Sequence, residues 1–387
     1  MNSTNFNTGF VTGLAIGKKK FVSGGNIPIP EIDVEWQPPD WWDLPEPASN
    51  QVTAFLRVMS TDGYIAVNIQ KGITKNEFVT IDWGDGNVET TPTLDEYGTL
   101  HTDNYFQHNY STEYMQQSSQ RNPFGFPQAT ITITYDVLSS DGDEDGYKIV
   151  ELQIPHKNFD ISRYSMQVIG LKYGDKMCID EAIDYYSSQY LQYIKMNGRG
   201  VIPSIDTMFI TQSPALLRID FNSKETNLPN LRLGYNSNLQ TVNGLENLTE
   251  LTKDVFEYDI MLQKIDLPNC ISITGDGAFY ECTSLKEINM PKLETITGVY
   301  AFETCSALVD VNFPSLHTID LSNGISTFRN CFSYCTNLRR FNAPNLTSIE
   351  VEEFRNCYML KELYVADGCN FNGNTFSTCY NLDPKPK

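Results

Sequence analysis

The chain has 387 residues, of which 40% are hydrophobic and 20% charged, and its formal net charge is −20. This length allows two or three domains with substantial cores. The negative charge disfavours nucleic-acid binding, which needs a basic surface, and the short run Lys18, Lys19 and Lys20 does not offset it. No apolar run approaches the roughly 18 residues of a membrane span, so we expect no membrane insertion.

Residues 1–49 are predicted to form an N-terminal docking arm that ends in a Trp- and Pro-rich linker. The opening MNSTNFNTGFVTGLAIGKKKF places its basic residues after the apolar stretch, the reverse of a secretory signal. Apolar residues between 6 and 14 fit one helical face, and the linker tryptophans are too apolar to leave in water. We predict that the arm orders on another protein, a disordered tail being the alternative, and that the tryptophans dock on that partner or on the next domain. The predicted docking residues are Phe6, Phe10, Val11, Leu14, Trp36, Trp41 and Trp42.

Residues 50–160 carry the pattern of an all-β sandwich. Several segments alternate or run apolar, and turn clusters separate them. The letters DWGDG at 82–86 predict a tight glycine-dependent turn, and HNY follows at 108–110. W-G-D-G followed by His-x-Tyr resembles the PKD-like immunoglobulin-type sandwich, which implies that fold here. The segments predicted as strands are AFLRVM, YIAVNIQ, EFVTIDW, ATITITYDV and YKIVELQIP.

An acidic loop at 141–146 has the D-x-D-x-D-G spacing that opens an EF-hand calcium loop. Leu152 stands where the bidentate glutamate of that loop is required, and the flanking segments read as strands rather than helices. We therefore favour a solvated hairpin tip, with a calcium site as the alternative.

Leucines recur at a nearly fixed interval through residues 161–387, which predicts a solenoid of stacked coils. Apolar residues follow most of them after three and after five positions, as expected for a short strand, a turn and a return segment. One coil cannot bury its own apolar face, so each coil depends on its neighbours. Met166, Ile169 and Leu171 fit the same frame one repeat earlier. The ladder leucines are Leu191, Leu216, Leu239, Leu262, Leu285, Leu308, Leu338, Leu360 and Leu382.

The return segments share a further signature, a Phe-x-x-Cys element with leucine three residues after the cysteine. A proline follows several of the strands. This pattern resembles the leucine-rich repeats of the BspA-like type over about residues 165–387, and the element is missing before Leu239. The segments are AFYEC, AFETC, CFSYC, EFRNC and TFSTC, and the prolines are Pro268, Pro291, Pro314 and Pro344.

The nine cysteines are an odd number, which disfavours a full disulfide framework. Five share one repeat position, where a small buried group is needed, so we predict that they pack in the core. Cys331 and Cys335 could be half of a zinc site, but no matching Cys or His pair accompanies them. We predict no metal and no cofactor.

The outward residues of the repeat strands form a candidate ligand face. One outward column is almost entirely Asn and Asp, able to bind sugar hydroxyls or the backbone amides of a partner. A solvated polar face is the alternative that we favour, and no aromatic residue is expected in this column, which weakens a glycan interpretation. The column consists of Asp220, Asn243, Asp266, Asn289, Asn312 and Asn342. The neighbouring column consists of Arg218, Thr241, Lys264, Glu287, Asp310, Arg340 and Glu362.

Catalysis is not expected. The four histidines are scattered, and no Ser/His/Asp, HExxH, P-loop or dinucleotide signature accompanies them. An active site would therefore have to be formed by carboxylates that are distant in the sequence and that only folding brings together. We therefore predict no catalytic residues.

The order of the parts carries a wider resemblance. An arm, the Trp/Pro linker from Trp36 to Pro45, a WGDG sandwich and BspA-like repeats are similar to a family of tailed-phage virion proteins. The resemblance implies a multidomain, mainly β structural protein, a PKD-like sandwich followed by a leucine-rich-repeat solenoid, present in several copies in the virion. It implies assembly in the host cytoplasm, docking on other virion proteins, and contact with host glycan or protein from a tail, baseplate or head position. A bacterial surface adhesin of the BspA type is the alternative.

Overall fold

Strands make up almost all of the regular structure in this computed structural model. The predicted docking residues, all within residues 1–43, and the acidic loop 141–146 lie outside the described part of the chain. The structure describes residues 44–58, 64–69, 78–92, 105–116, 128–135, 148–150, 152–153, 166–175, 177–179, 191–197, 200–201, 208–222, 231–321, 330–349, 353–371, 375–376 and 378–382.

The N-terminal strands follow the alternation in the sequence. Ala129, Ile131 and Ile133 are buried, and the threonines between them are half-buried, as the two-residue period of a strand requires. The elements are β1 (Gln51–Val58), β2 (Tyr64–Ile69), β3 (Phe78–Asp82), β4 (Val88–Pro92), β5 (Tyr105–Asn109), α1 (Thr112–Gln116), β6 (Gln128–Tyr135), β7 (Lys148–Val150) and β8 (Leu152–Gln153). Strands β1, β6, β3 and β4 pair antiparallel in that order, and β5, β2 and β8 form a second sheet. The PKD-like sandwich stays a prediction.

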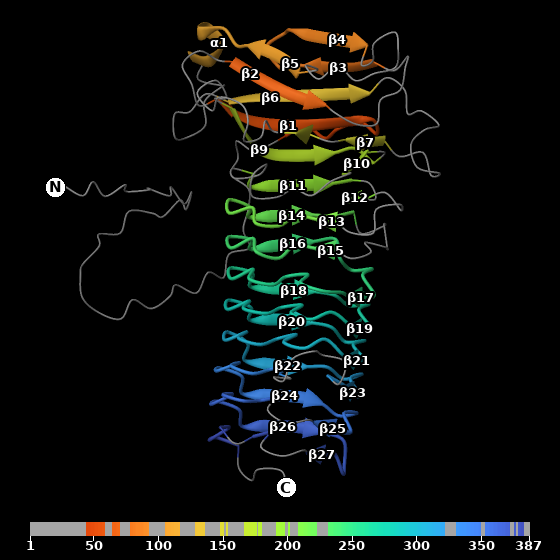
Figure 1. Ribbon diagram of the computed structural model, residues 1–387, viewed down its shortest axis with the longest axis vertical. Helices are drawn as coiled ribbons and strands as arrows, with labels where there is room; N and C mark the ends of the chain where they lie inside the picture. Colours follow the sequence, from red (N-terminus) through yellow and green to blue (C-terminus); the bar gives the residue numbers. More distant parts are fainter. Residues whose placement is uncertain are drawn as a thin grey trace, which may run out of the picture. The chain divides into compact units, whose positions relative to one another are not determined.

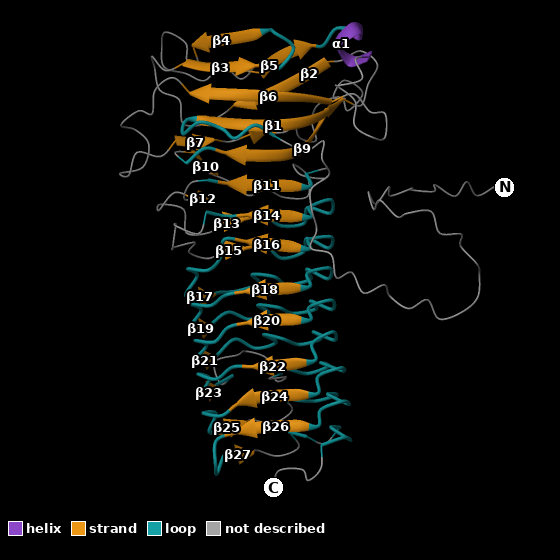
Figure 2. Cartoon of the chain, turned by 180° about the vertical axis from the view of Figure 1, so that it is seen from behind, coloured by secondary structure: helices purple, strands orange, loops and turns teal. Residues whose placement is uncertain are grey.

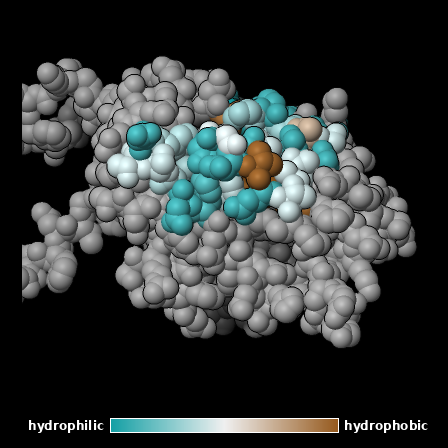
Figure 3. Space-filling model, turned by 90° about the horizontal axis from the view of Figure 1, so that it is seen from above, coloured by the Kyte–Doolittle hydropathy of each residue, from teal (hydrophilic) through white to brown (hydrophobic). Residues whose placement is uncertain are grey.

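Seen from above, the described surface at the β4 end is mainly hydrophilic, with only a small hydrophobic patch (Figure 3). Val88 on the edge strand β4 is 58% exposed. A short edge strand that ends in Pro92 limits pairing with other chains.

The repeats stack one short strand above another (Figure 1). Within each coil the middle residue of the strand points inward, and Ile219, Val242 and Ile265 are buried. The strands pair in parallel within the groups β9 to β16, β18 with β20, and β22 to β26. They are β9 (Met166–Tyr173), β11 (Tyr193–Met196), β14 (Arg218–Asp220), β16 (Thr241–Asn243), β18 (Lys264–Asp266), β20 (Glu287–Asn289), β22 (Asp310–Asn312), β24 (Arg340–Ala343) and β26 (Glu362–Val365).

The return segments form further short parallel sheets. Their inward residues Leu251, Ile273 and Ile296 are fully buried. Strands β17, β19, β21 and β23 form one sheet, β13 pairs with β15, β25 pairs with β27, and β7, β10 and β12 form another. They are β10 (Met177–Ile179), β12 (Gly200–Val201), β13 (Met208–Phe209), β15 (Leu231–Arg232), β17 (Glu250–Leu251), β19 (Ser272–Ile273), β21 (Thr295–Ile296), β23 (Thr318–Ile319), β25 (Ser348–Ile349) and β27 (Asn370–Phe371).

One sheet joins the N-terminal strands to the repeats. Strand β1 pairs antiparallel with β6 along one edge and antiparallel with β9 along the other. The resulting eight-stranded sheet has the order β16-β14-β11-β9-β1-β6-β3-β4. The first repeat strand therefore has no open edge, because β1 covers it. The predicted domain boundary between residues 160 and 161 lies outside the described residues.

The frame predicted for the first repeat is wrong by two residues. Leu171 pairs with Ile194, and Tyr173 pairs with Met196, so Leu171 takes the position expected for Ile169. A shift of two residues keeps every side chain on the same face of a strand, so the apolar pattern does not distinguish the two frames.

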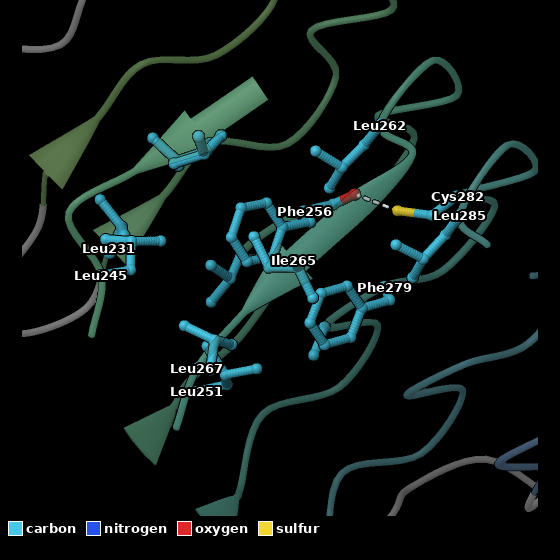
Figure 4. Close-up of a cluster of buried hydrophobic side chains, with 14 of the residues drawn as sticks. Leu231, Leu245, Leu251, Phe256, Leu262, Ile265, Leu267, Phe279, Cys282 and Leu285 are labelled. Atoms are coloured by element: carbon cyan, nitrogen blue, oxygen red, sulfur yellow. Dashed lines mark hydrogen bonds between the residues drawn. The ribbon is translucent and has the colours of Figure 1, made fainter. Parts of the chain in front are cut away.

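A column of phenylalanines and a column of cysteines run through the repeat core. Phe256, Phe279 and Phe302 stack with ring centroids 5.1 Å apart and nearly parallel planes. The Cys282 thiol donates to the Phe256 carbonyl oxygen of the preceding coil at 3.0 Å (Figure 4). Four further thiols repeat this contact at 3.1–3.3 Å. All five cysteines that share the repeat position are buried and outside any disulfide among the described cysteines, so their packing role is the observed one: Cys282, Cys305, Cys335, Cys357 and Cys379.

Candidate interaction surfaces of the repeat region

The predicted Asn/Asp column lies on the outward side of the repeat strands. The registers pair Asp220 with Asn243, Asp266 with Asn289, and Asn312 with Asn342. Each is at least partly exposed, whereas the residue before it in most of these strands is buried. The structure therefore brings the six predicted residues to one face, and their ligand role stays a prediction.

Hydrogen bonds divide this column into pairs. The Nδ2 of Asn243 donates to the Oδ1 of Asp220 at 2.8 Å, and the Nδ2 of Asn289 donates to the Oδ1 of Asp266 at 2.6 Å. The third pair is Asn342 with Asn312, at 2.7 Å. Each pair fixes two side chains and leaves a second polar atom on each amide and on Asp266 for a ligand or for water, whereas the second oxygen of Asp220 also accepts hydrogen bonds from Tyr193 and Arg218.

The neighbouring outward column is linked by ion pairs. The Nζ of Lys264 lies 3.2 Å from the Oε2 of Glu287, and the Nε of Arg340 lies 2.7 Å from the Oε2 of Glu362. Exposed pairs of this kind contribute only about 0.2–1 kcal/mol. The strand face is thus a polar surface whose side chains mostly satisfy one another.

An aromatic residue continues the Asn/Asp column at one end, contrary to the expectation of none there, and a buried tyrosine contacts the column at its other end. Tyr364 pairs in register with Asn342, so it continues the Asn/Asp column, and it is 51% exposed. At the other end, the Tyr193 hydroxyl donates to the Oδ2 of Asp220 at 2.9 Å. The prediction missed Tyr364 because it lies one coil beyond the last asparagine, whereas Tyr193 belongs to the neighbouring column, to which the expectation did not apply.

The end of the predicted linker is fixed to the first repeat strands. The Oε1 of Glu46 lies 2.8 Å from the Nζ of Lys172, and its Oε2 lies 3.0 Å from the Nζ of Lys195. Partial burial alone would raise the pKa of Glu46, but hydrogen bonds from both lysines outweigh it and lower the pKa to about 2. Leu44 is also buried. Within the predicted arm, residues 44–49 therefore belong to the folded sheet region.

The loops before the ladder leucines carry a tyrosine in each successive coil from residue 235 to residue 380. These loops lie beyond the ends of the repeat strands (Figure 2). The rings of Tyr235 and Tyr258 stack with centroids 5.0 Å apart, and those of Tyr358 and Tyr380 stack at 6.0 Å. We call this set the tyrosine edge: Tyr235, Tyr258, Tyr280, Tyr300, Tyr334, Tyr358 and Tyr380.

The same loops hold a left-handed backbone residue in nearly every coil. It lies four positions before the ladder leucine, and its φ is between +54° and +67°. Non-glycine residues seldom adopt this conformation, and β-branched or bulky side chains do so least. The column comprises Gln212, Tyr235, Tyr258, Glu281, Thr304, Tyr334 and Asn356.

Carboxylates accompany the tyrosines on these loops. Glu257 accepts a hydrogen bond from Tyr235 and lies beside Asp254. Burial and the charge of Asp254 raise the pKa of Glu257 to about 7. Glu281 and Glu303 occupy the next two coils, and burial also raises the pKa of Glu303.

One buried carboxyl occupies the cysteine position. Asp259 and Asn236 stand in earlier coils where later coils have cysteine, and both are fully buried. The Nδ2 of Asn236 donates to the Ile210 carbonyl at 2.6 Å, the equivalent of the cysteine contact. The Oδ1 of Asp259 accepts from the backbone N–H of Asn236 at 2.8 Å, but its Oδ2 has no hydrogen-bond partner among the described residues. Burial raises the pKa of Asp259 well above its usual value.

The W-G-D-G turn and the His-x-Tyr element come together in the N-terminal strands. The Nε2 of His108 lies 2.8 Å from the Oδ2 of Asp85, and the His108 ring stacks on Trp83 at 5.0 Å. The Tyr110 hydroxyl donates to the Trp83 carbonyl at 2.8 Å. Gly84 has φ +76°, and a Cβ there would lie 2.2 Å from the Thr130 carbonyl oxygen, so glycine is required. Trp83 and Tyr110 are buried, which gives this cluster a structural role.

No set of three or more His, Cys, Asp or Glu side chains in the described part of the chain is arranged to hold a metal ion. No helix there combines the length and hydrophobicity needed to cross a membrane.

Comparisons with known proteins bear on the repeats. The BspA type leucine rich repeat region matches in six copies, over residues 211–319 and 315–383. No curated protein sequence matches the chain.

Several solved structures are similar to this chain. A leucine-rich repeat protein of T. pallidum is 18% identical, with 60% of this chain and 91% of that chain covered and a TM-score of 0.32. One from Bacteroides ovatus is 14% identical, covering 61% and 81%, with a TM-score of 0.34. A leucine rich cell surface protein of Faecalibacterium prausnitzii is 16% identical, covering 64% and 73%, with a TM-score of 0.34. From the family match, residues 211–383 of this chain are leucine-rich repeats of the BspA type.

Proposed function

We propose that this protein is a binding protein rather than an enzyme, and that it is a structural component of a phage virion. In this proposal the N-terminal arm docks on other virion proteins, and the repeats contact a protein or a host surface. Solenoids of stacked repeats expose long continuous surfaces suited to such contacts.

The observation that carries the proposal is the continuous sheet between β4 and β16. Because β1 pairs with both β6 and β9, backbone hydrogen bonds rather than a flexible linker join the N-terminal strands to the repeats. A stiff connection of this kind suits a protein that holds a recognition surface at a fixed position on a particle.

The linker contact supports the same arrangement. Glu46 is held by Lys172 and Lys195, so the C-terminal end of the predicted linker is fixed to the first repeat strands. An arm that docked on a particle from this point would position the whole repeat region through one short attachment. The proposed contacts of the arm remain Phe6, Phe10, Val11, Leu14, Trp36, Trp41 and Trp42.

A cell-surface adhesin is the second candidate. The BspA-type repeats favour it as much as they favour a virion protein. What favours the virion is the resemblance of the arm, the Trp/Pro linker and the W-G-D-G element together, in the order found here.

Immunogold electron microscopy tests the proposal, using gradient-purified particles and an antibody against residues 240–387. Label on tails or baseplates supports attachment, and label over heads supports a fibre or decoration. Particles assembled with a chain that lacks residues 1–43 should lose the label. Unlabelled particles with label on the cells would overturn the virion assignment in favour of the adhesin.

A further inference from the structure

Strand β26, which ends the stack of repeat strands in Figure 1, has a neighbouring strand on one edge only among the described residues. It pairs in parallel with β24, and the backbone N–H of Glu362 donates to the Arg339 carbonyl oxygen at 3.0 Å. The backbone groups of consecutive strand residues point to opposite edges, so the N–H and C=O groups of Leu363 and Val365 point away from β24. An edge of this kind is a template for pairing with another chain.

The apolar side chains of this last coil are less covered than those of the coil before it. Leu363 and Val365 are half-buried. The residues at the same positions of β24, Phe341 and Ala343, are fully buried. Phe371 on β27 is half-buried as well. Each coil of a solenoid buries its apolar face against its neighbours, so the last one needs a cover.

Residues 383–387, which read DPKPK, do not continue the apolar pattern. Counted from the ladder leucine Leu382, the two inward positions of the next strand fall on Lys385 and Lys387. Lysine is almost never fully buried unless it is paired, and the prolines beside these lysines lack a backbone N–H. This segment is therefore a poor cover for the coil before it.

The opposite end of the repeats shows what a suitable cover is. There strand β1 pairs antiparallel with β9, the first repeat strand. Ala54 lies opposite Leu171 in this pairing, and both side chains are buried. An antiparallel strand with apolar inward residues thus closes the parallel stack of this protein at one end.

Strand β26 is complementary to itself in one antiparallel register. A two-fold axis at Tyr364 places Leu363 opposite Val365 of a second copy, so the inward apolar residues meet on one face. The two Tyr364 side chains then lie opposite each other on the outward face, and aromatic cross-strand pairs are favourable. Lys361 just before the strand and Asp367 shortly after it are both exposed, and the same axis brings them opposite each other.

The neighbouring registers lack this complementarity. A shift of one residue sets inward side chains against outward ones. A shift of two residues in one direction puts Val365 opposite Lys361, and a shift in the other direction puts Leu363 opposite Asp367. Each places a charge against an apolar side chain, so the register centred on Tyr364 is the favoured one.

We infer that β26 pairs antiparallel with β26 of a second copy of this chain and joins two repeat regions end to end in a two-fold dimer. Leu363 of each copy exchanges backbone hydrogen bonds with Val365 of the other. The same surface serves both copies, as a two-fold dimer requires. The inference concerns another part of the molecule than the N-terminal arm and does not rest on the virion assignment, so the immunogold experiment fails or succeeds separately.

Sedimentation velocity of the full chain from about 1 to 100 µM tests the pairing, because a dimer dissociates on dilution. Val365→Pro removes an N–H that points to the second copy and leaves the bonds to β24 in place, and proline is tolerated at such an edge. We expect the unaltered chain to dimerise and this variant to stay monomeric, with circular dichroism confirming its fold. Val365→Thr keeps the N–H and the branched shape, so this matched control should still dimerise. A monomeric unaltered chain, or a dimer that persists in Val365→Pro, would overturn the inference.

Charge reversal at Lys361 and Asp367 tests the register without altering the backbone. Lys361→Asp sets carboxylates against each other across the axis, and Asp367→Lys sets ammonium groups against each other. Each single variant should raise the dimer dissociation constant about tenfold at low salt. An equimolar mixture of the two variants should recover the dimer, because opposite charges meet again.

Net charge alone gives a different result. The chain carries −20, so general repulsion would be lessened by Asp367→Lys, and that variant would then dimerise more tightly. Tighter dimerisation of Asp367→Lys, or a mixture that dimerises no better than the single variants, would contradict the proposed pairing of β26.

Discussion

The strand side and the loop side of the same coils differ in their side chains and in their backbone conformation. On the strand side, polar residues such as Asn289 and Asp266 pair with their neighbours, and no residue within the described repeat strands has a positive φ. On the loop side, buried Phe and Cys columns lie next to strained backbone and exposed tyrosines. The loops therefore pack the coils together and also expose the tyrosine side chains. On the strand face, by contrast, substitutions should cost little stability.

The largest contrast is expected between Phe302→Ala and Asn289→Ala. Phe302 is fully buried between Phe279 and Phe332, at centroid distances of 5.1 and 5.0 Å, so its truncation leaves a cavity and should cost about 3–5 kcal/mol in the free energy of unfolding. Asn289→Ala removes one exposed hydrogen bond and should cost less than about 1 kcal/mol. Urea unfolding measures both. Similar losses from the two variants would contradict the division between the sides.

The second contrast concerns Asp259 in the cysteine column. We expect Asp259→Asn to stabilise the protein by about 1–3 kcal/mol at neutral pH, because the amide oxygen can still accept from Asn236 and no carboxyl remains to be desolvated. The replacement imitates Asn236 in the preceding coil, where an amide already fills this position.

The gain should depend on pH in a defined direction. Burial raises the folded-state pKa of Asp259 above the unfolded value of about 4. The unfolded chain therefore releases this proton first, and stability falls as pH rises from about 4 toward the folded-state pKa. Urea unfolding of both proteins at acidic and neutral pH should show the variant gaining most at neutral pH. A gain independent of pH would show that ionisation of Asp259 is not the cause.

The sequence predicted the strand side of the coils better than the loop side. Strand residues such as Asn289 and Asn312 keep a fixed distance from the ladder leucine, so alignment alone placed them on one face. The tyrosines lie two, four, five or eight residues before that leucine, so no fixed column contains them. Only the folded loop, which gathers several positions at one edge, makes them neighbours.

Long-range contacts explain the other departures from the sequence-based account. The register of β9 depends on β1, more than a hundred residues earlier in the chain, and a two-residue shift leaves no trace in the apolar pattern. The contact of Glu46 with Lys172 joins two segments that carry no shared motif. The W-G-D-G turn and His108 were linked in advance only through resemblance to a known motif, and the hydrogen bond to Asp85 gives that link a physical basis.

A smaller gain is expected at the left-handed loop position. Thr304 has φ +63°, and a β-branched side chain is poorly suited to that conformation. Thr304→Asn should stabilise the protein by about 0.5–1 kcal/mol. The same replacement at Thr297, which is outside the left-handed region, provides the control and should give no gain. Thermal unfolding of the two variants compares them directly, and equal effects would show that backbone strain is not what the loop variant relieves.

The smallest effect is expected for the ion pair between Lys264 and Glu287. Their side chains are 66% and 69% exposed, and the charged atoms are 3.2 Å apart, so water and salt screen most of the attraction. A double-mutant cycle with Lys264→Ala and Glu287→Ala should give a coupling of about 0.2–1 kcal/mol at low ionic strength and less at high salt. A larger coupling that salt does not reduce would mean that the strand face is as tightly organised as the loops. In that case the contrast between the two sides of the coil would reflect composition rather than a division of roles.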